Sequence, residues 1–563
     1  MKVSEFITEY LLEHGINQCF SVTGGFAMHL NDSFGQKMNV MYTHGENPAG
    51  YSALGYSSIG SPSICCITSG CGATNAVTPC MIAYQDSVPV FFISGQVHKD
   101  VNIRMFKSKG KSIRGYFGSD VDIISMVSSI TKFSHELWNP LNIKSVLDEC
   151  LYNLTNGRLG PVWLSIPVDV QSMNVPNDCI SLFVPPVILS IAQLPTEFFD
   201  IWTSASRPLV LAGNGIHISR CEDKFNNFLE DQKVPFIVSF FGIDLNDKYI
   251  GKVGLIGNRS GNFTVQNCDV LLCLGCRLSK SITGYNRELF APNCKIIYID
   301  IDENEFISEK NTTLNICMDL KTFFTLDIPK CKLDPEWIIR TNKWRDNWSC
   351  ELPSTESDNP YPITKKFFET KPENSISVAS SGSLYCVVWH MFKYKPGDRF
   401  ISSGHGDMGY EVPVSIGASL HGKTVYSFVG DGSFQLNLQE LQTIKTYNLP
   451  VVIMYYNNGG YGAIQLTQQN IFKRLFGTSV STGIECPDIK KLASVYDIPY
   501  YSSEKVDYTT LTGPAIVEVI CKVQTRLPCI SNKLMPDGTF KNLPYEDMFP
   551  YLEKSELNDN MFV

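Results

Sequence analysis

The sequence predicts an α/β protein with three domains, each built on a doubly wound parallel sheet. Short apolar runs alternate with amphipathic stretches along most of the chain, a pattern typical of strand–helix–strand units. Several of these runs end in glycine-rich or polar turns, where parallel sheets bind ligands. The chain has 563 residues, of which 44% are hydrophobic, and this length corresponds to about three or four domains.

The expected domains follow from changes in composition. The first covers residues 1–180 and ends after the apolar run GPVWLSIPVDVQ. A proline-rich linker, NVPNDCISLFVPPVILSIAQLP, leads to a second domain over residues 195–330, because prolines at this density interrupt regular elements. A third domain is expected over residues 365–535, followed by a tail over residues 536–563.

Residues 430–462, GDGSFQLNLQELQTIKTYNLPVVIMYYNNGGYG, carry the strongest functional signal. They predict a strand end, a Gly-Asp-Gly turn, an amphipathic helix, an apolar strand and an Asn-Asn turn. A parallel crossover places Asp431 and Asn458 at the same carboxyl end of a sheet. An acid and an amide there suit Mg²⁺, which prefers oxygen ligands and keeps phosphate oxygens in its shell.

A GDGS turn followed at this distance by Asn-Asn resembles the thiamin diphosphate signature of the acetohydroxyacid (acetolactate) synthase and pyruvate decarboxylase superfamily. The alternative is a plain Rossmann-like crossover. The resemblance implies a pyrimidine-binding first domain, a Rossmann-like central domain and a diphosphate-binding third domain. It implies that Asp431, Asn458 and Gly460 bind Mg²⁺. The residues expected around the cofactor in the third domain are Gly406, Met408, Gly430, Asp431, Gly432, Ser433, Asn458, Gly460 and Tyr461.

Glu46 is the expected catalytic residue. It follows a short apolar strand and precedes a helix rich in small residues, in the run YTHGENPAGYSALGY. Alone, it would be a solvated loop carboxylate or a helix N-cap partner. The resemblance implies that it hydrogen-bonds the aminopyrimidine ring of the cofactor and assists in removing the thiazolium proton.

Met408 is the candidate for the apolar wedge that holds this cofactor in its bent conformation. It lies in the run SSGHGDMGYEVPVSIGAS, which resembles the corresponding family segment, and a flexible thioether suits an irregular gap. The alternative is an ordinary core methionine.

The central domain raises the question of FAD. The run AGNGIHIS predicts a strand, a glycine turn and a helix start, but it is an incomplete dinucleotide-binding motif. GCRLSKSITGY and IIYIDID resemble segments that contact FAD in acetohydroxyacid synthases. The resemblance implies Gly213, Gly215, Arg277 and Asp300 as FAD-contacting positions, and an empty Rossmann-like domain is the alternative.

The expected reaction is decarboxylation of pyruvate or a similar 2-oxo acid, with transfer of the remaining unit to an acceptor carbonyl. Acceptor choice stays open, because the chain departs from the acetohydroxyacid synthase pattern at Val168, in the run 465–468 and in the run 118–120. The runs NNGGYGAIQLTQQNIF and LPYEDMFPYL resemble acetolactate-synthase-like proteins of polysaccharide gene clusters, some of which act on a nucleotide-linked keto sugar. The sequence is also compatible with a simple decarboxylase, a 2-oxo acid oxidase or a catalytically silent scaffold homologue.

Composition limits the partners. A net charge of −9 argues against nucleic acid, and no apolar run reaches the ~20 residues that span a bilayer. The amphipathic, acid-bearing N-terminus does not resemble a targeting peptide, so a cytoplasmic protein is expected. Of the 19 cysteines, those in SICCIT and NCDVLLCLGCRL fit buried strands better than disulfides or a zinc site. The family geometry implies a homodimer or homotetramer with active sites between subunits.

Overall fold

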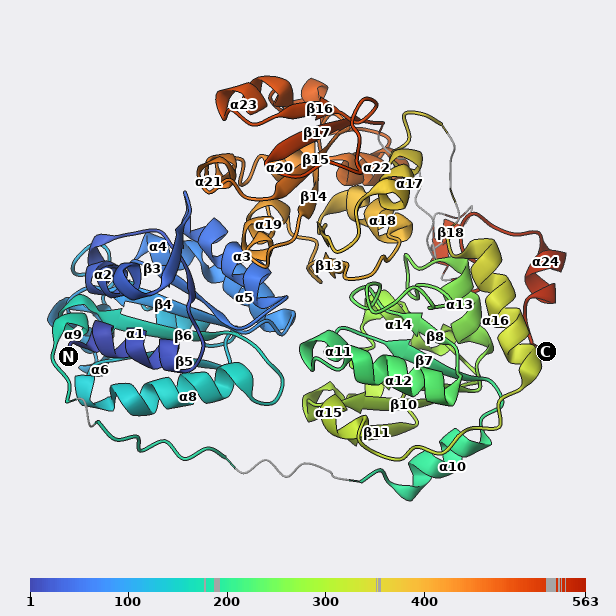
Figure 1. Ribbon diagram of the computed structural model, residues 1–563, viewed down its shortest axis with the longest axis horizontal. Coiled ribbons are helices and arrows are strands. Elements are labelled where there is room, and N and C mark those ends of the chain that lie inside the picture. Colours follow the sequence, from blue (N-terminus) through green and yellow to red (C-terminus); the bar gives the residue numbers. More distant parts are fainter. Residues whose placement is uncertain are drawn as a thin grey trace.

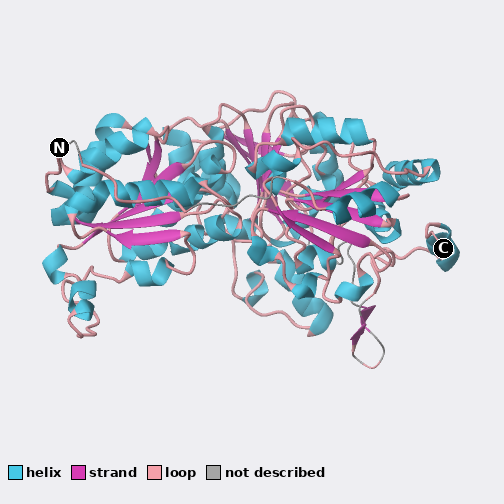
Figure 2. Ribbon diagram, turned by 90° about the horizontal axis from the view of Figure 1, so that it is seen from below, coloured by secondary structure: helices cyan, strands magenta, loops and turns pink. Residues whose placement is uncertain are grey.

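The computed structural model contains three parallel sheets, each enclosed by helices (Figures 1 and 2). It describes residues 1–176, 179–186, 193–350, 352, 356–522, 533–534, 537, 539–541 and 543–562. Each sheet lies inside one of the three ranges expected for the domains. The expected boundary between residues 535 and 536 lies outside the described residues.

The first domain has a six-stranded sheet with the order β2-β1-β3-β4-β6-β5. Its strands are β1 (Gln18–Ser21), β2 (Asn39–Tyr42), β3 (Ser63–Ile67), β4 (Val90–Gln96), β5 (Phe133–Glu136) and β6 (Val162–Pro167). Its helices are α1 (Val3–Glu13), α2 (Met28–Lys37), α3 (Glu46–Ser57), α4 (Cys71–Asn75), α5 (Val77–Gln85), α6 (Ile103–Ser108), α7 (Ile123–Val127), α8 (Ile143–Thr155) and α9 (Val168–Ser172). The central strands β3 and β4 are buried along their whole length, as expected for a sheet covered on both faces.

The second domain has a five-stranded sheet with the order β11-β10-β9-β7-β8. Its strands are β7 (Pro208–Ala212), β8 (Phe236–Val238), β9 (Val270–Leu274), β10 (Lys295–Asp300) and β11 (Leu314–Cys317). Its helices are α10 (Thr196–Ser204), α11 (Gly215–Ile218), α12 (Glu222–Gln232), α13 (Arg259–Asn267), α14 (Lys280–Thr283), α15 (Leu320–Phe323) and α16 (Pro335–Trp348). The strand order reverses between β7 and β9, which makes their carboxyl ends the expected ligand crevice.

The third domain has a six-stranded sheet with the order β13-β12-β14-β15-β17-β16. Its strands are β12 (Ile376–Val378), β13 (Arg399–Ile401), β14 (Val425–Gly430), β15 (Val451–Asn457), β16 (Tyr500–Ser502) and β17 (Ala515–Ile520). Its helices are α17 (Pro360–Thr370), α18 (Gly382–Met391), α19 (Glu411–Ser419), α20 (Asp431–Phe434), α21 (Glu440–Thr446), α22 (Gly462–Ile471) and α23 (Ile489–Val495). When the strands of the first and third sheets are numbered along the chain, both sheets read 2-1-3-4-6-5.

The chain ends beside the second domain. The last described elements are β18 (Lys533–Leu534), just before the expected tail, and β19 (Phe540–Lys541) and α24 (Lys554–Asp559) within it. The Tyr545 hydroxyl donates to the Ile282 carbonyl over 2.6 Å, and Trp344 Nε1 donates to Asn560 Oδ1 over 2.8 Å. These contacts hold the tail against α14 and α16 (Figure 1).

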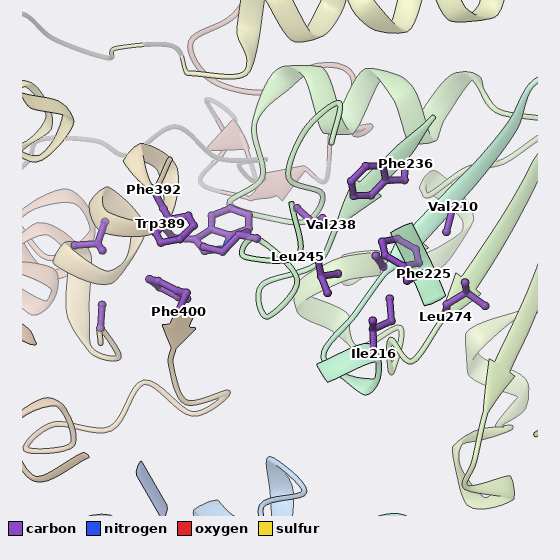
Figure 3. Packing of buried hydrophobic residues seen from close by; sticks show 14 of the residues in the cluster. Val210, Ile216, Phe225, Phe236, Val238, Leu245, Leu274, Trp389, Phe392 and Phe400 are labelled. Atoms are coloured by element: carbon purple, nitrogen blue, oxygen red, sulfur yellow. The ribbon is translucent and has the colours of Figure 1, made fainter. Parts of the chain in front are cut away.

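The second and third domains share one hydrophobic core. Figure 3 shows Trp389, Phe392 and Phe400 of the third domain facing Val238 and Leu245 of the second, and all five side chains are buried. A charged contact accompanies this packing: Arg399 Nε lies 2.9 Å from Asp244 Oδ2. This continuous core fixes the two domains relative to one another.

Candidate active site

Asp431 forms the centre of the turn after β14. Its side chain is 1% exposed, and it is the first residue of α20. Its Oδ2 accepts hydrogen bonds from the backbone N–H groups of Asn458, Gly459 and Gly460 over 3.1, 2.8 and 2.9 Å. Burial raises the pKa of this carboxyl, although the backbone donors act in the opposite direction. The aspartate therefore joins the two turns that follow β14 and β15.

The Asn-Asn turn presents two amides with different surroundings. Asn457 Nδ2 donates to Glu518 Oε1 over 2.8 Å. Asn458 Oδ1 is buried and accepts no hydrogen bond from the residues that the structure describes. Such an arrangement costs free energy unless a ligand supplies a partner. Gly460 has φ +130°, which a residue with a side chain rarely adopts. The predicted Mg²⁺ ligands Asp431, Asn458 and Gly460 thus lie in adjoining turns at one sheet edge.

The helix expected after the Gly-Asp-Gly turn is divided into α20 and α21. The prediction of one amphipathic helix is wrong because Asn437, between the two pieces, turns its side chain away from solvent. Its Nδ2 donates to the carbonyl of Gly409 over 2.6 Å and contacts Asn47 Oδ1 over 3.3 Å. A tertiary contact with two other segments has overridden the helical pattern.

Met408 lies on a turn between β13 and α19, and 40% of its surface is exposed. Gly406, two residues before Met408, and Gly409, directly after it, have φ +71° and +80°. Gly409 N donates to Ser433 Oγ over 2.8 Å, and that hydroxyl donates to Glu411 Oε2 over 2.8 Å. The turn that carries Met408 is therefore fastened to α20, and the methionine is not an ordinary core residue.

Ser433 and Tyr461 are predicted to contact the cofactor. Both also make contacts within the protein that hold the neighbouring turns together. The hydroxyl of Ser433 is engaged with Gly409 and Glu411, as described above. The ring of Tyr461 lies so close to Gly432 that a Cβ there would overlap it. Gly432 thus permits close packing of the turn after β14 against the start of α22, while Gly430 has open space in front of its Cα.

Glu46 is the first residue of α3, after the short strand β2. Asn75 Nδ2 donates to its Oε2 over 3.0 Å. The glycine-rich turn after β3 passes beside it, since a Cβ at Gly72 would lie 3.2 Å from Glu46 Oε1. The carboxylate thus lies at the carboxyl edge of the first sheet.

Helices α3 and α19 pack tightly and position Glu46 relative to the Met408 turn. Gly55 of α3 lies against the backbone of Val414, and Gly417 of α19 lies against the backbone of Ser52. A further polar contact joins the two domains, because the N–H of His44 donates to Glu440 Oε1 over 3.0 Å. Burial raises the pKa of Glu440. In the described residues, Glu46 itself makes no hydrogen bond to the third domain.

Buried polar atoms without partners gather at the carboxyl edges of the first and third sheets. Thr68 Oγ1 and Ser69 Oγ follow β3. Those of the third domain include Ser380 Oγ, Ser402 Oγ, Asp407 Oδ2 and Asn458 Oδ1, and the hydroxyls of Tyr410, Ser427 and Thr478 also lack partners among the described residues. Such atoms require partners from outside the chain, and hydroxyl, carboxylate and amide groups suit a hydrated Mg²⁺ and a diphosphate. The residues present therefore fit thiamin diphosphate with Mg²⁺. Ser380 lies outside the motifs identified in the sequence, and Ser402 begins the run that carries Met408 but was not itself predicted as a site residue.

A large cavity of about 670 Å³ lies between the domains. It opens at the carboxyl ends of β7 and β9, where the order of the second sheet reverses. Three of the four residues predicted to contact FAD line it: Gly215, Arg277 and Asp300. Gly213 lies just behind, against the backbone of Gly275. The glycines permit the turns after β7 and β9 to cross closely.

The first and third domains also contribute to this cavity, which sequence reasoning missed. Asp86 reaches it from the end of α5, and burial raises the pKa of this carboxyl to about 7. Its two carboxylate oxygens accept from Gly404 N over 3.4 and 3.3 Å. Gly404, His405 and Gly406 line the same cavity, so the segment that leads to Met408 forms part of its wall.

Two further observations bear on the expectations. The cysteines of the runs SICCIT and NCDVLLCLGCRL are all buried and free, and the described residues contain no group of three His, Cys, Asp or Glu side chains arranged to hold a metal. Among the helices that the structure describes, none combines the length and apolar character needed to cross a membrane.

Three family models match the chain in order. Residues 1–126 match the N-terminal thiamine pyrophosphate (thiamin diphosphate) binding domain of thiamine pyrophosphate enzymes. Residues 196–326 match the central domain, and residues 380–526 match the C-terminal thiamine pyrophosphate binding domain. The three matches together cover most of the chain. The central match contains the whole second sheet, and the other two contain most strands of the first and third sheets.

Several curated relatives resemble the chain over almost its full length. It is 28% identical to a probable acetolactate synthase large subunit of Methanocaldococcus jannaschii, over 96% of this chain and 95% of the relative. It is 29% identical to the acetolactate synthase large subunit of Lactococcus lactis, over 95% of each protein. It is also 29% identical to the chloroplastic acetolactate synthase 3 of Brassica napus, over 96% of this chain and 86% of the relative.

Proposed function

Because the chain belongs to the thiamine pyrophosphate enzyme family, we propose that it is an acetolactate synthase-like carboligase. It would decarboxylate pyruvate or a similar 2-oxo acid and transfer the remaining acyl unit to an acceptor carbonyl. The observation that carries the proposal is the unpartnered Asn458 Oδ1 beside buried Asp431. This pair, in the turns after two adjacent parallel strands, suits a divalent cation that holds a diphosphate.

The chain's own residues have distinct roles in this proposal. Asp431, Asn458 and the Gly460 carbonyl would hold Mg²⁺, and Met408 would support the cofactor. Glu46 holds or releases a proton at the pyrimidine ring. When bound, thiamin diphosphate supplies the electron sink that lets a 2-oxo acid lose carbon dioxide.

The net reaction balances without an oxidant. One pyruvate, one acceptor carbonyl and one proton give carbon dioxide and an α-hydroxy ketone. The bond from the keto carbon to the carboxylate breaks, and a bond from that carbon to the acceptor carbon forms. With a second pyruvate as acceptor, the product is acetolactate. In enzyme nomenclature this chemistry falls among the transferases and lyases.

FAD is the second cofactor that we propose, for the cavity between the domains. Its volume of about 670 Å³ lies in the range of cofactor pockets. The cationic Arg277 lies at the end of β9, and its Nη1 donates to the carbonyl of Gln85 over 3.0 Å. Purified wild-type protein should retain flavin absorbance, and Arg277→Ala should lose it. The control is Arg220→Ala, on the exposed turn after α11, which should retain the absorbance. A wild-type protein that does not bind added FAD in equilibrium dialysis would contradict this cofactor.

Assembly and compartment are also proposals. Glu46 makes no hydrogen bond to the third domain within the described residues, and we expect it to face the cofactor of a second copy in a homodimer or homotetramer. Light scattering coupled to gel filtration measures this state, and a monomer that retains activity would contradict it. Free buried cysteines favour a reducing compartment, so we place the protein in the cytoplasm.

The first test uses purified protein with thiamin diphosphate, Mg²⁺ and pyruvate, with and without FAD. Pyruvate consumption and product mass are followed, with Glu46→Gln as the inactive control. We expect acetolactate from the wild type, and about 10²–10⁴-fold less from the variant. Acetaldehyde alone would indicate a simple decarboxylase, and oxygen consumption an oxidase. Cofactor binding with pyruvate left untouched would direct the search to other donors or a silent homologue.

A further inference from the structure

A strongly cationic segment follows β4 in the first domain. Residues 99–117, named here the basic loop, include η2 (Lys99–Val101) and α6 (Figure 1). Their only acid is Asp100, and their cations are Lys99, Arg104, Lys107, Lys109, Lys111 and Arg114. The whole chain has a net charge of −9, so this loop reverses the sign of the charge locally.

Only two of these six cations form a salt bridge with the described residues. Arg104 and Lys107 contact Asp122 over 2.8 and 3.2 Å. The other four make no salt bridge in the part of the chain that the structure describes. Like charges gathered on a short segment repel one another, and they raise the local concentration of an anionic ligand. A carboxylate with a single charge requires far fewer cations, so the loop suits a polyanion.

Both ends of the loop are fastened to the domain. At its start, Asn102 Nδ2 donates to the buried Glu136 Oε1 over 2.7 Å. At its end, Tyr116 N donates to Asp120 Oδ2 over 3.0 Å, and Gln96 Nε2 donates to the Val121 carbonyl over 2.8 Å. Residues 107–118 between these contacts are all exposed. The loop therefore presents its charges to solvent from a fixed base.

The base of the loop reaches the candidate active site. β4 is parallel to β3, so the loop begins at the sheet edge that carries Glu46. At its far end, Ser119 lies against Gly70, whose Cβ would come 2.7 Å from the Ser119 carbonyl oxygen. The same glycine-rich turn continues to Gly72, beside Glu46. Both ends of the loop thus lie at the sheet edge that carries Glu46.

Exposed aromatic side chains accompany the charges. Tyr116 and Phe117 are 65% and 56% exposed. The Tyr116 ring lies 5.1 Å from that of Phe106, and the Phe117 ring meets Phe26 edge-on at 5.6 Å. Exposed rings beside cations are the combination that binds a base together with its phosphates.

We propose that the basic loop binds the diphosphate of a nucleotide-linked carbonyl acceptor, with Tyr116 stacked on the base. The inference rests on the proposed carboligase function and names the acceptor class of that site. Lys109, Lys111 and Arg114 hold the phosphates. The carbonyl of the acceptor then extends past Ser119 toward Glu46 and receives the acyl unit.

The test measures binding of CDP, UDP, GDP, ADP and inorganic pyrophosphate to the enzyme by titration calorimetry. Thiamin diphosphate, Mg²⁺ and FAD are saturating, so that neither cofactor position can take the probe. The triple variant Lys109→Glu/Lys111→Glu/Arg114→Glu is compared with Lys224→Glu/Lys490→Glu/Lys505→Glu, which changes the net charge equally at distant exposed positions. The corresponding triple alanine variants are measured as well, because alanine removes the charges without introducing new ones that could prevent folding.

We expect a nucleoside diphosphate to bind the wild type and the distant variant equally, and the loop variant at least about tenfold more weakly. Tyr116→Ala should weaken the binding of the nucleoside diphosphate and leave the binding of inorganic pyrophosphate unchanged. Equal binding by both triple variants, or none by the wild type, would overturn the inference. So would an oligonucleotide that binds more tightly than every nucleoside diphosphate.

Failure of this inference is distinguishable from failure of the proposed function. Pyruvate consumption without an added acceptor is measured on the same preparations. If the enzyme consumes pyruvate but does not bind nucleoside diphosphates, the proposed function stands and the acceptor assignment fails. An enzyme that binds them and leaves pyruvate untouched loses the carboligase proposal, and the acceptor assignment with it.

Discussion

Gly417 lies directly against the backbone of Ser52, so that a Cβ on the glycine would overlap the Ser52 carbonyl oxygen. The contact joins α19 of the third domain to α3 of the first. Near it, Ser52 Oγ donates to the Pro413 carbonyl over 2.9 Å. Since α3 begins at Glu46 and α19 follows the Met408 turn, this crossing fixes the positions of these two segments relative to each other within one chain.

Gly417→Ala should destabilise the protein by about 1–3 kcal/mol, because a backbone neighbour cannot move aside as a side chain can. Denaturant unfolding followed by circular dichroism measures the change. Gly160→Ala is the matched control, because its Cβ would meet only the flexible side chain of Lys132. Equal effects of the two substitutions would show that the helix crossing is not tightly packed.

Asn458→Ala should abolish stabilisation by thiamin diphosphate with Mg²⁺. A ligand at a hundredfold excess over its Kd adds about 2.7 kcal/mol to the free energy of unfolding, and the variant should not gain this. Asn457→Ala provides the control, because that amide is bonded to Glu518 and should matter for stability but not for the cofactor. The midpoint of thermal unfolding is measured for each variant with and without the cofactor. If the cofactor still raises the midpoint of Asn458→Ala, the metal assignment is contradicted.

Acid should destabilise the protein partly through His390. Burial lowers the pKa of this imidazole to about 4, and the nearby Lys252 acts in the same direction. His390 Nε2 donates to the Ile256 carbonyl over 2.5 Å, while Nδ1 faces the Tyr361 hydroxyl at 2.8 Å. The neutral ring can therefore satisfy both of its nitrogens in the folded state.

The direction of this change in stability follows from the different proton binding of the folded and unfolded states. Above about pH 6.5, the ordinary pKa of histidine, the ring is neutral in both states and its contribution to stability is complete. Between about pH 6.5 and 4, the unfolded state binds the proton first, so the free energy of unfolding falls as pH falls. His390→Gln should reduce this slope in urea titrations at successive pH values. An unchanged slope would exclude His390 as its source.

Lys252 should contribute to the junction of the second and third domains. Its buried Nζ donates to the carbonyls of Trp389, His390 and Phe392 over 2.5, 3.0 and 3.3 Å, which are the free carbonyls at the end of α18. Lys252→Met keeps much of the volume and leaves these carbonyls without a donor, so about 1–3 kcal/mol should be lost. Lys393→Met, on an exposed lysine two residues beyond α18, should be neutral in the same unfolding assay.

The elements around Asp431 were predictable because the motif is local. A strand, a glycine turn and a second strand at fixed spacing require no knowledge of distant residues, and the structure has β14, α20 and β15 in that order. The short strand before Glu46 and the helix after it were predictable for the same reason. The individual roles of Glu46, Met408 and the cofactor-contacting glycines stay predictions.

What the sequence could not supply depends on tertiary contacts. The break between α20 and α21 follows from the bond of Asn437 to Gly409, which are 28 positions apart. The contribution of Asp86 to the cavity depends on how α5 meets the turn at Gly404. Neither feature leaves a periodic or compositional signal.

The shared strand order of the first and third sheets has a consequence for how the molecule assembles. The helices that meet, α3 and α19, each follow the second strand of their sheet. Two copies of one architecture thus contact each other through corresponding surfaces, as the subunits of a symmetric dimer do. Here a covalent tether holds them together, so the association is intramolecular and independent of protein concentration. The two domains differ in what they carry at their sheet edges: Glu46 lies in the first, and the turns at Asp431 and Asn458 lie in the third.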